Sequence, residues 1–340
     1  LYPVPFVILW LLFLFKFLEK KKRKFLFFAG VVLGFGFYSY HAARVMMPFY
    51  ILATIVFLLP EIKRNRQLAA WLLGGFLLPL LPLVPWTIQY PETLFADQVR
   101  YVGITSLFSM ESLMHRLDVF ISYFNPIYLF LLGDASLIHS TSLHHPLGLL
   151  KSSVHAGVFL IPLAIFIPLG IYESLKLKSE MSKLFVFAFF TAPIAGVLAG
   201  DHWRYSRIMV ILPFAVILSV YGIRFLLMQK NKVAKLLLYG LSALSIIQFS
   251  YFAYDYFTAY RIRSYNWMKY NIPGALEEII KQDSANPAAT IYLDNKISFI
   301  DRYWKFYLIK HSKEELTDRT KFIDPQVVES GELVKGSILM

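Results

Sequence analysis

The chain has 340 residues, of which 57% are hydrophobic and 17% are aromatic, and its formal net charge is +12. A soluble domain of this size cannot hide so much apolar surface from water, so we expect lipid to surround most of the chain. The sequence contains no cysteine, which excludes disulfides and thiolate metal sites.

The positive charge is concentrated in four clusters that alternate with very apolar segments. The clusters are Lys16 with 20–24, then 63–66, 176–183 and 224–235. With four neighbouring Glu residues, their 16 Lys and Arg account for the whole net charge. Lys and Arg in short loops are retained on the cytoplasmic side of a membrane. The basicity therefore indicates a cytoplasmic rim that meets anionic membrane lipids, and we expect no nucleic-acid partner.

Eight apolar segments are candidates for membrane spans: 1–18, 25–43, 46–60, 68–86, 154–172, 184–200, 207–227 and 234–257. The first two could form one re-entrant hairpin, but the six basic residues at and between them favour two spans. The third is short, and we expect Pro48 and Pro60 at its ends. The sequence thus predicts an all-α polytopic protein of the plasma (inner) membrane with about eight transmembrane helices. Its transmembrane domain covers 1–257, and both the long loop at about 87–153 and the tail at 258–340 are expected to be extracytoplasmic.

The external loop contains an amphipathic stretch. Apolar residues recur at 110, 113, 114, 117, 120, 121 and 124, and the polar residues Glu111, His115, Arg116, Asp118 and Ser122 fall on the other face. A helix with this division lies in the membrane interface. The run 127–132 that follows is too short to span, and we expect it to pack as a re-entrant piece under the loop.

After Phe257 the composition becomes that of a small soluble α/β unit. We expect a helical turn or two at 275–281, a strand at 289–293, and a second strand or a short helix at 303–309. This tail holds 12 Lys and Arg and 11 Asp and Glu, a balance that fits an exported segment.

The first candidate site on the expected outer side is 38–44, with Tyr38, Tyr40 and Arg44. A guanidinium there can bind a phosphate with two hydrogen bonds, and tyrosine hydroxyls can add donors. The alternative is an interfacial anchor of aromatic residues and a snorkelling arginine.

The second candidate site is 200–207, where two arginines and a histidine oppose the positive-inside tendency. If a helix begins by Arg204, then Arg204 and Arg207 share a face and can converge on one anionic group near the helix N-terminus, with His202 beside them. The alternative is a local salt bridge between Asp201 and Arg204.

The third candidate site is Asp134 with His139, His144 and His145. Zinc is one interpretation, but the spacing matches no helical metal motif, and we expect no metal there. A carboxylate and an imidazole that face an active-site cavity, or a plain polar loop, are the alternatives.

Three stretches carry a resemblance to a known family. "YSYHAARVMMP" follows an apolar segment, "DQVRYVGITSLFSMESLMHRLDVFISYFNPIYLFLLGD" lies in the long loop, and "GDHWRYSRIMVILPFAVILSVYGI" opens a later segment. Together they resemble the polytopic glycosyltransferases of family 39, relatives of the protein O-mannosyltransferases and the aminoarabinose transferases, which have the C-type glycosyltransferase fold. The tail "RYWKFYLIKH", with Asp324-Pro325 after it, is similar to the soluble end of such bacterial proteins.

The resemblance implies transfer of a sugar from a polyprenyl-phosphate donor to an acceptor protein or glycolipid on the outer face of the membrane. Arg44, Arg204 and Arg207 match the phosphate-binding role and His202 assists, while Tyr38, Tyr40 and His139 are further substrate contacts. No cofactor is implied, although a divalent metal at the departing phosphate stays open. The family's acidic catalytic pair belongs to the first external loop, which we expect upstream of Leu1, and Asp134 is a further candidate for the base.

Two other classes of function stay open on the sequence. A lipid-linked glycan polymerase, ligase or exporter also has a long external loop with arginines and histidines. The other class is a non-catalytic membrane scaffold. For such a protein, replacement of Arg204 and Arg207 would leave every glycan product of the cell unchanged. An acidic pair in the first external loop would favour the transferase.

Overall fold

A computed structural model describes residues 2–91, 109–132, 156–177, 179–200, 202–259, 271–285, 287, 290–297, 299–324 and 334–340. The chain divides into two compact units, Leu1–Thr258 and Ala259–Met340. The division falls next to Phe257, where the composition of the sequence changes.

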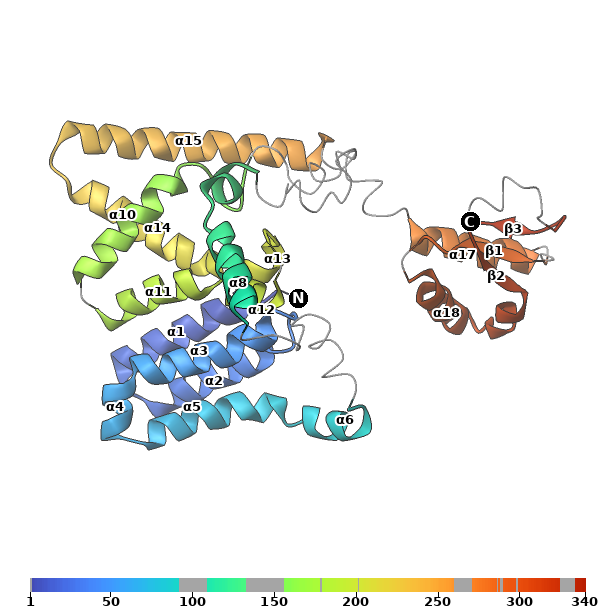
Figure 1. The fold of residues 1–340 in the computed structure, drawn as a ribbon, viewed down its shortest axis with the longest axis horizontal. Helices are drawn as coiled ribbons and strands as arrows, with labels where there is room; N and C mark the ends of the chain where they lie inside the picture. Colours follow the sequence, from blue (N-terminus) through green and yellow to red (C-terminus); the bar gives the residue numbers. More distant parts are fainter. Residues whose placement is uncertain are drawn as a thin grey trace. The chain divides into compact units, whose positions relative to one another are not determined.

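The first unit is helical. Its first half contains α1 (Val4–Lys20), α2 (Arg23–Gly36), α3 (Ala43–Phe57), α4 (Leu59–Arg64), α5 (Gln67–Leu77), the 3-10 turn η1 (Leu78–Leu80) and α6 (Leu83–Gln89). Its second part contains α8 (Met110–Tyr123), the π-helical turn η3 (Tyr128–Leu132), α10 (Leu163–Leu177), α11 (Glu180–Thr191), α12 (Ile194–Ala199), α13 (Tyr205–Ile208), α14 (Ile211–Met228) and α15 (Lys232–Phe257). The long helices run back and forth between two ends of the unit, as Figure 1 shows.

Among the described residues, three helical segments are long and apolar enough to cross a membrane: Glu180–Ala199, Ile211–Met228 and Lys232–Phe257. A fourth is counted if Gln67–Leu80 and Leu83–Gln89, which are bent by 47°, form one span. The expected number of eight is therefore not supported. The other apolar segments form shorter helices, with 17 residues in α1, 14 in α2 and 15 in α3.

Proline and local backbone account for much of this difference. Pro79 and Pro82 lie where the expected span 68–86 breaks, because proline lacks the N–H that continues a helix. The expected span 154–172 becomes helical at Leu163. The expectation for Pro48 was wrong: α3 begins at Ala43 and contains this proline, whereas Pro60 does lie in the first turn of α4.

Two helix pairs pack with their backbones in close approach. A Cβ added at Gly170 in α10 would lie 1.7 Å from the carbonyl oxygen of Leu218 in α14, and one at Gly222 would lie 2.0 Å from that of Phe166. α2 and α5 approach each other in the same way: a Cβ added at Gly30 in α2 would lie 2.2 Å from the carbonyl oxygen of Leu72 in α5. Small residues permit such contacts between apolar helices. Gly34 lies in the same α2–α5 contact, where an added Cβ would lie 2.5 Å from the carbonyl oxygen of Phe76.

The basic clusters fall in the turns at one end of the first unit. The turns from α1 to α2, from α4 to α5, from α10 to α11 and from α14 to α15 lie on the left in Figure 1. Lys21, which ends α1 in a left-handed conformation, lies 3.8 Å from Glu61 of α4, and Arg23 donates to Gln67 of α5. The opposite end contains the start of α1, the connection from α2 to α3 and the connection from α12 to α13.

The second unit is a small α/β fold. A parallel sheet in the order β2-β1-β3 contains β1 (Ile291–Asp294), β2 (Thr320–Ile323) and β3 (Ile338–Leu339). Ile291 pairs with Thr320 on one side and with Ile338 on the other. The other elements are α17 (Ile272–Ala285), α18 (Ile300–His311) and the 3-10 helix η4 (Glu314–Arg319). The helix predicted at 275–281 and the strand predicted at 289–293 are confirmed within a few residues, and 303–309 adopts the helical alternative.

The core of the second unit lies between its two helices and the sheet. Leu276 of α17, Leu293 of β1 and Trp304 of α18 are each at most 2% exposed. Asp283 of α17 is 4% exposed, and both of its carboxylate oxygens accept hydrogen bonds from Arg319, at 3.0 and 3.1 Å. This ion pair fixes the end of η4 to α17.

Candidate functional site

The helix α8 is the predicted amphipathic helix of the long loop. Met110, Met114 and Ile121 of its apolar stripe expose 74%, 60% and 60% of their surface, while Val119 and Tyr123 are buried. The helix packs on α12 (Figure 1). Part of its polar face meets the connection from α12 to α13, so its apolar stripe points outward, as in a helix that lies in a membrane interface.

His202 joins the α12–α13 connection to the polar face of α8. Its Nε2 lies 3.6 Å from Oδ2 of Asp118, and its Nδ1 lies 3.2 Å from Oγ of Ser122. The ring of His115 lies one helical turn before Asp118, with its centroid 5.5 Å from that of His202. The His202 imidazole is therefore held between a carboxylate and a hydroxyl.

Two left-handed backbone conformations shape the same connection. Gly200 has a φ of 68° and Trp203 a φ of 53°. Glycine adopts this region freely, whereas for a bulky side chain it is strained. The Trp203 indole N–H donates to the carbonyl oxygen of Ser122 at 3.0 Å, and the ring stacks on Tyr128 with the centroids 6.5 Å apart. Contacts with α8 and η3 thus hold Trp203 in a conformation of the kind that gathers at functional sites.

The two arginines of the 200–207 cluster lie in different surroundings. The helix begins at Tyr205, so Arg204 is its extended N-cap residue and is exposed. Arg207 lies inside α13 and is only 7% exposed. We expected Arg204 and Arg207 to share a helix face if the helix began by Arg204. Because α13 begins at Tyr205, that condition is not met. Any group that contacts both guanidinium groups has to bridge the surface and the interior of this end of the unit.

Tyr2 brings the first and second predicted sites together. Its ring centroid lies 6.5 Å from that of Tyr40, which lies 6.0 Å from that of His41. Burial raises the pKa of Tyr205, and the electrostatic interaction with Tyr2 raises it further. The start of α1, the α2–α3 connection and α13 therefore meet at the end of the unit that lies opposite the basic turns.

The other residues of the first predicted site have separate positions. Arg44 lies in the first turn of α3 and is half-buried. The Tyr38 hydroxyl donates to the carbonyl oxygen of Pro79 at 2.8 Å. Because Pro79 lies next to the break between η1 and α6, the hydroxyl of Tyr38 supports the bent pair of helices.

An apolar groove opens between α1 and α14 and has a volume of about 390 Å³. Its lining residues are Val4, Ile8, Leu11, Leu12, Phe15, Leu212, Pro213, Val216 and Ile217. Val4 lies two residues after Tyr2, and Leu212 five residues after Arg207, so the groove begins a few residues from both segments. From Val4 to Phe15 the groove follows α1 for about 16 Å at 1.5 Å per residue.

Part of the predicted chemistry falls outside the described residues. Asp134, His139, His144 and His145 of the third site, and Asp201 of the second, are among the residues that the structure does not describe. Within the part of the chain that it does describe, no group of three or more His, Asp or Glu could hold a metal ion.

Sequence reasoning did not assign Asp118 or Ser122 to a site. The available signal was the spacing of His115, Asp118 and Ser122, which repeats at three and four residues and places them on one face of α8. Their contact with His202 joins segments about 80 residues apart, for which the sequence pattern gave no sign.

Comparisons with family models, curated proteins and solved structures gave no match to this chain.

Proposed function

We propose that this chain acts in a membrane glycosyltransferase similar to the family 39 enzymes, which takes a sugar from a polyprenyl-phosphate donor and transfers it to an acceptor protein or glycolipid. The observation that carries the proposal is the apolar groove between α1 and α14, whose lining includes Val4, two residues after Tyr2, and Leu212, five residues after Arg207. A polyprenyl phosphate has an apolar chain and an anionic head. In this proposal the apolar groove binds the chain, and the arginines near the starts of α3 and α14 bind the head.

Each part of the donor has a place in this proposal. The prenyl chain lies in the groove, which opens sideways because Ile8 and Val216 are 52% and 57% exposed. The buried Arg207 binds the phosphate from the interior of the unit. The exposed Arg204 and the half-buried Arg44 bind it closer to the surface. The His202 ring, which Asp118 positions, adds a further donor.

The reaction is a displacement at the anomeric carbon. The bond from that carbon to the phosphate oxygen breaks, a bond to the acceptor oxygen forms, and the acceptor proton passes to a carboxylate base. Polyprenyl phosphate departs with the electron pair of the broken bond, and the arginines stabilise its charge. In the family that this sequence resembles, the base belongs to an acidic pair in the first external loop.

The charge distribution supports an extracytoplasmic site. The basic turns occupy one end of the first unit, and the arginine cluster lies at the other end. Retention of short basic loops in the cytoplasm would place the cluster on the outer face of the plasma membrane. The exposed apolar stripe of α8 would then lie in the outer interface, beside the site that its polar face completes.

Binding of a fluorescent polyprenyl phosphate to the full chain in lipid nanodiscs tests the proposal. Arg204→Ala should weaken binding about 10- to 100-fold, because a hydrogen bond to a charged group contributes roughly 1.5–3 kcal/mol. The fold should be retained, since Arg204 is exposed. Val216→Trp, which fills the groove, should also weaken binding. Arg224→Ala is the matched control, because it removes the same charge from an exposed position near the basic end.

Unchanged binding in both Arg204→Ala and Val216→Trp would refute the donor site. The polymerase, ligase or exporter alternative predicts a different preference. Such a protein would bind a lipid-linked oligosaccharide in place of the monosaccharide phosphate, so direct competition between these two lipids separates the classes.

A further inference from the structure

The helix α18 of the second unit has an exposed apolar face beside its buried one. Ile300, Trp304 and Leu308 are buried in the core, at most 3% exposed. Phe299, Tyr303, Phe306 and Ile309 are 62%, 43%, 60% and 56% exposed. These four residues are spaced by four, three and three positions, so they form one stripe, which we call the aromatic face. A contiguous exposed apolar stripe of this kind marks an interaction surface.

The backbone at the start of the aromatic face is strained. Phe299 precedes α18 in the left-handed region, with a φ of 62°, and bulky residues seldom occupy this region. The ring gains no burial in return, because it is largely exposed. The Arg302 guanidinium carbon lies 5.3 Å from the centre of this ring. The local structure therefore keeps an aromatic ring and a cation together at the surface.

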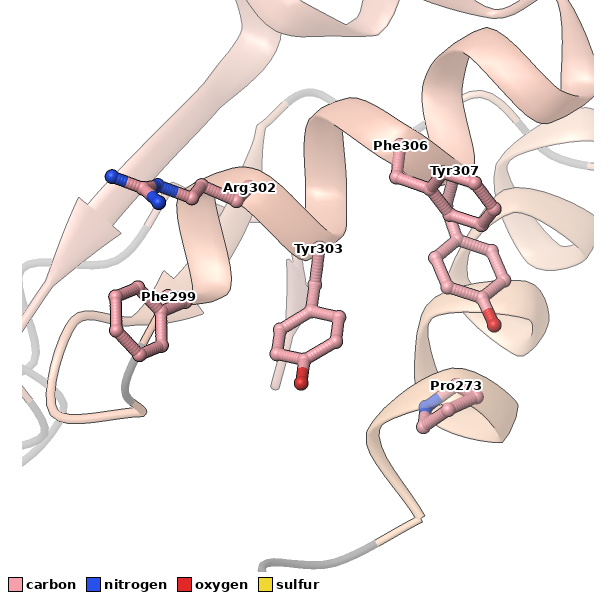
Figure 2. Close-up of a pocket in the computed structure, with 6 residues that line it drawn as sticks. All are labelled: Pro273, Phe299, Arg302, Tyr303, Phe306 and Tyr307. Atoms are coloured by element: carbon pink, nitrogen blue, oxygen red, sulfur yellow. The ribbon is translucent and has the colours of Figure 1, made fainter. Parts of the chain in front are cut away.

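A cavity of about 450 Å³ adjoins the aromatic face, and Figure 2 shows its six lining residues. They are Pro273, Phe299, Arg302, Tyr303, Phe306 and Tyr307. In Figure 2 the rings of Phe299 and Tyr303 project from the same side of α18, and Pro273 lies across from them. These six residues include no carboxylate or amide side chain, so the lining has few acceptors for the hydroxyl groups of a sugar. It suits an apolar ligand that carries an anionic group near Arg302.

The charges around the aromatic face favour anionic partners. Arg302 and Lys305 are exposed on α18 beside the stripe. Lys310 at its end is held by Glu277 and is less available. Aromatic rings next to Arg and Lys form the composition with which proteins contact the headgroup region of a bilayer.

We propose that the aromatic face docks the second unit on the surface of a bilayer that contains anionic lipids. Phe299, Phe306 and Ile309 enter the boundary between headgroups and acyl chains, while Arg302 and Lys305 contact lipid phosphates. A bilayer is within reach, since 14 residues separate Phe257, the end of the apolar helix α15, from Ile272. Fully extended, they span at most about 50 Å. The proposal does not require the glycosyltransferase function.

The absence of native cysteine gives a direct test on the full chain. Ile309→Cys, at the edge of the aromatic face, is labelled with a dye and placed in nanodiscs of phosphatidylglycerol and phosphatidylcholine in equal parts, which include a lipid that carries a quencher in its upper acyl chain. We expect quenching at this position. Lys321→Cys, at an exposed position of β2, is the matched control and should show little quenching.

Two further variants in the Ile309→Cys background identify the cause. Phe299→Ser with Phe306→Ser should abolish the quenching, and because both rings are exposed, the thermal unfolding of the second unit should not change. Arg302→Gln should reduce quenching in the mixed nanodiscs and have little effect in phosphatidylcholine alone. Equal quenching at positions 309 and 321, or quenching that survives the loss of both phenylalanines, would overturn the proposal. Energy transfer between differently labelled copies in place of quenching would identify the face as a self-association surface and would also overturn it.

Discussion

The substitution Asp283→Ala should destabilise the second unit by about 1.5–3 kcal/mol, because it removes a buried carboxylate and its charged hydrogen bonds, while the partly exposed arginine left behind regains contact with water. Asp283 is 4% exposed and accepts two hydrogen bonds from Arg319, whose side chain is 33% exposed. The unit comprises the 82 residues from Ala259 to Met340. A domain of that size has a total stability of roughly 4–12 kcal/mol, so the loss is a large share of the whole.

Hydrogen exchange of the full chain in nanodiscs, read by mass spectrometry, measures this loss without separating the units. Amides of β1 and α17 should exchange faster in Asp283→Ala, while amides in α10 and α14 of the first unit should keep their rates. Glu277→Gln is the matched control, since it removes a carboxylate of the same unit from a solvent-exposed pair with Lys310. It should have a much smaller effect.

A double replacement separates the ion pair from local packing. Asp283→Leu with Arg319→Met exchanges the pair for apolar groups and should recover most of the protection that Asp283→Ala loses. Equal exchange in Asp283→Ala and Glu277→Gln would show that the buried pair contributes no more than an exposed one, and the reasoning would be refuted.

Two further predictions concern helix packing and pH. Gly222→Val should lower the thermal stability of the first unit, with a cost of about 1–3 kcal/mol or more, because its Cβ would lie 2.0 Å from the carbonyl oxygen of Phe166. Gly240→Val in α15, where an added Cβ meets nothing within 4 Å, should leave the melting temperature in detergent nearly unchanged, and equal shifts would contradict the packing argument. Glu277 and Lys310 should stabilise the second unit between about pH 4.5 and 10.5. Their hydrogen bond lowers the pKa of Glu277 below 4.5, so the stabilisation by Glu277 is lost as the pH falls through that pKa. The same bond raises the pKa of Lys310 above 10.5, so the stabilisation by Lys310 is lost as the pH rises through that pKa. Melting curves of Glu277→Gln and the native chain should therefore differ at neutral pH and converge in acid, and a constant difference would count against the pair.

Local periodicity predicted individual elements well. The apolar repeat in 110–124 and the polar positions between its members identified α8, because both follow from the geometry of a single helix. The sequence of 303–309 left a strand and a short helix as alternatives, also because only local pattern was available. A short run with aromatic and aliphatic residues fits a strand or a helix, and the burial of Trp304 and Leu308, four residues apart, shows which face the core selects.

The number of spans and the composition of the site depend on interactions that local patterns do not contain. A hydropathy window averages over Pro79 and Pro82, whereas the backbone breaks there and turns by 47°. The expectation that Arg204 and Arg207 share a face depended on where a helix begins, and such boundaries are the least certain part of a sequence-based assignment. The contact of His202 with Asp118 needs the fold to bring α8 onto the α12–α13 connection.

The helix α15 has a property that bears on how the surrounding membrane acts on the protein. Only 11% of its most apolar stretch is buried in the described structure, and one polar attachment is the side chain of Gln248, which accepts a hydrogen bond from the backbone N–H of Ile161 at 2.8 Å. In a bilayer its neighbours would be mostly acyl chains. Its 26 residues rise about 39 Å, more than the roughly 30 Å of hydrocarbon in a typical bilayer. Bilayer thickness would therefore set the tilt of α15, and with it the depth at which the chain leaves the lipid on its way to the second unit.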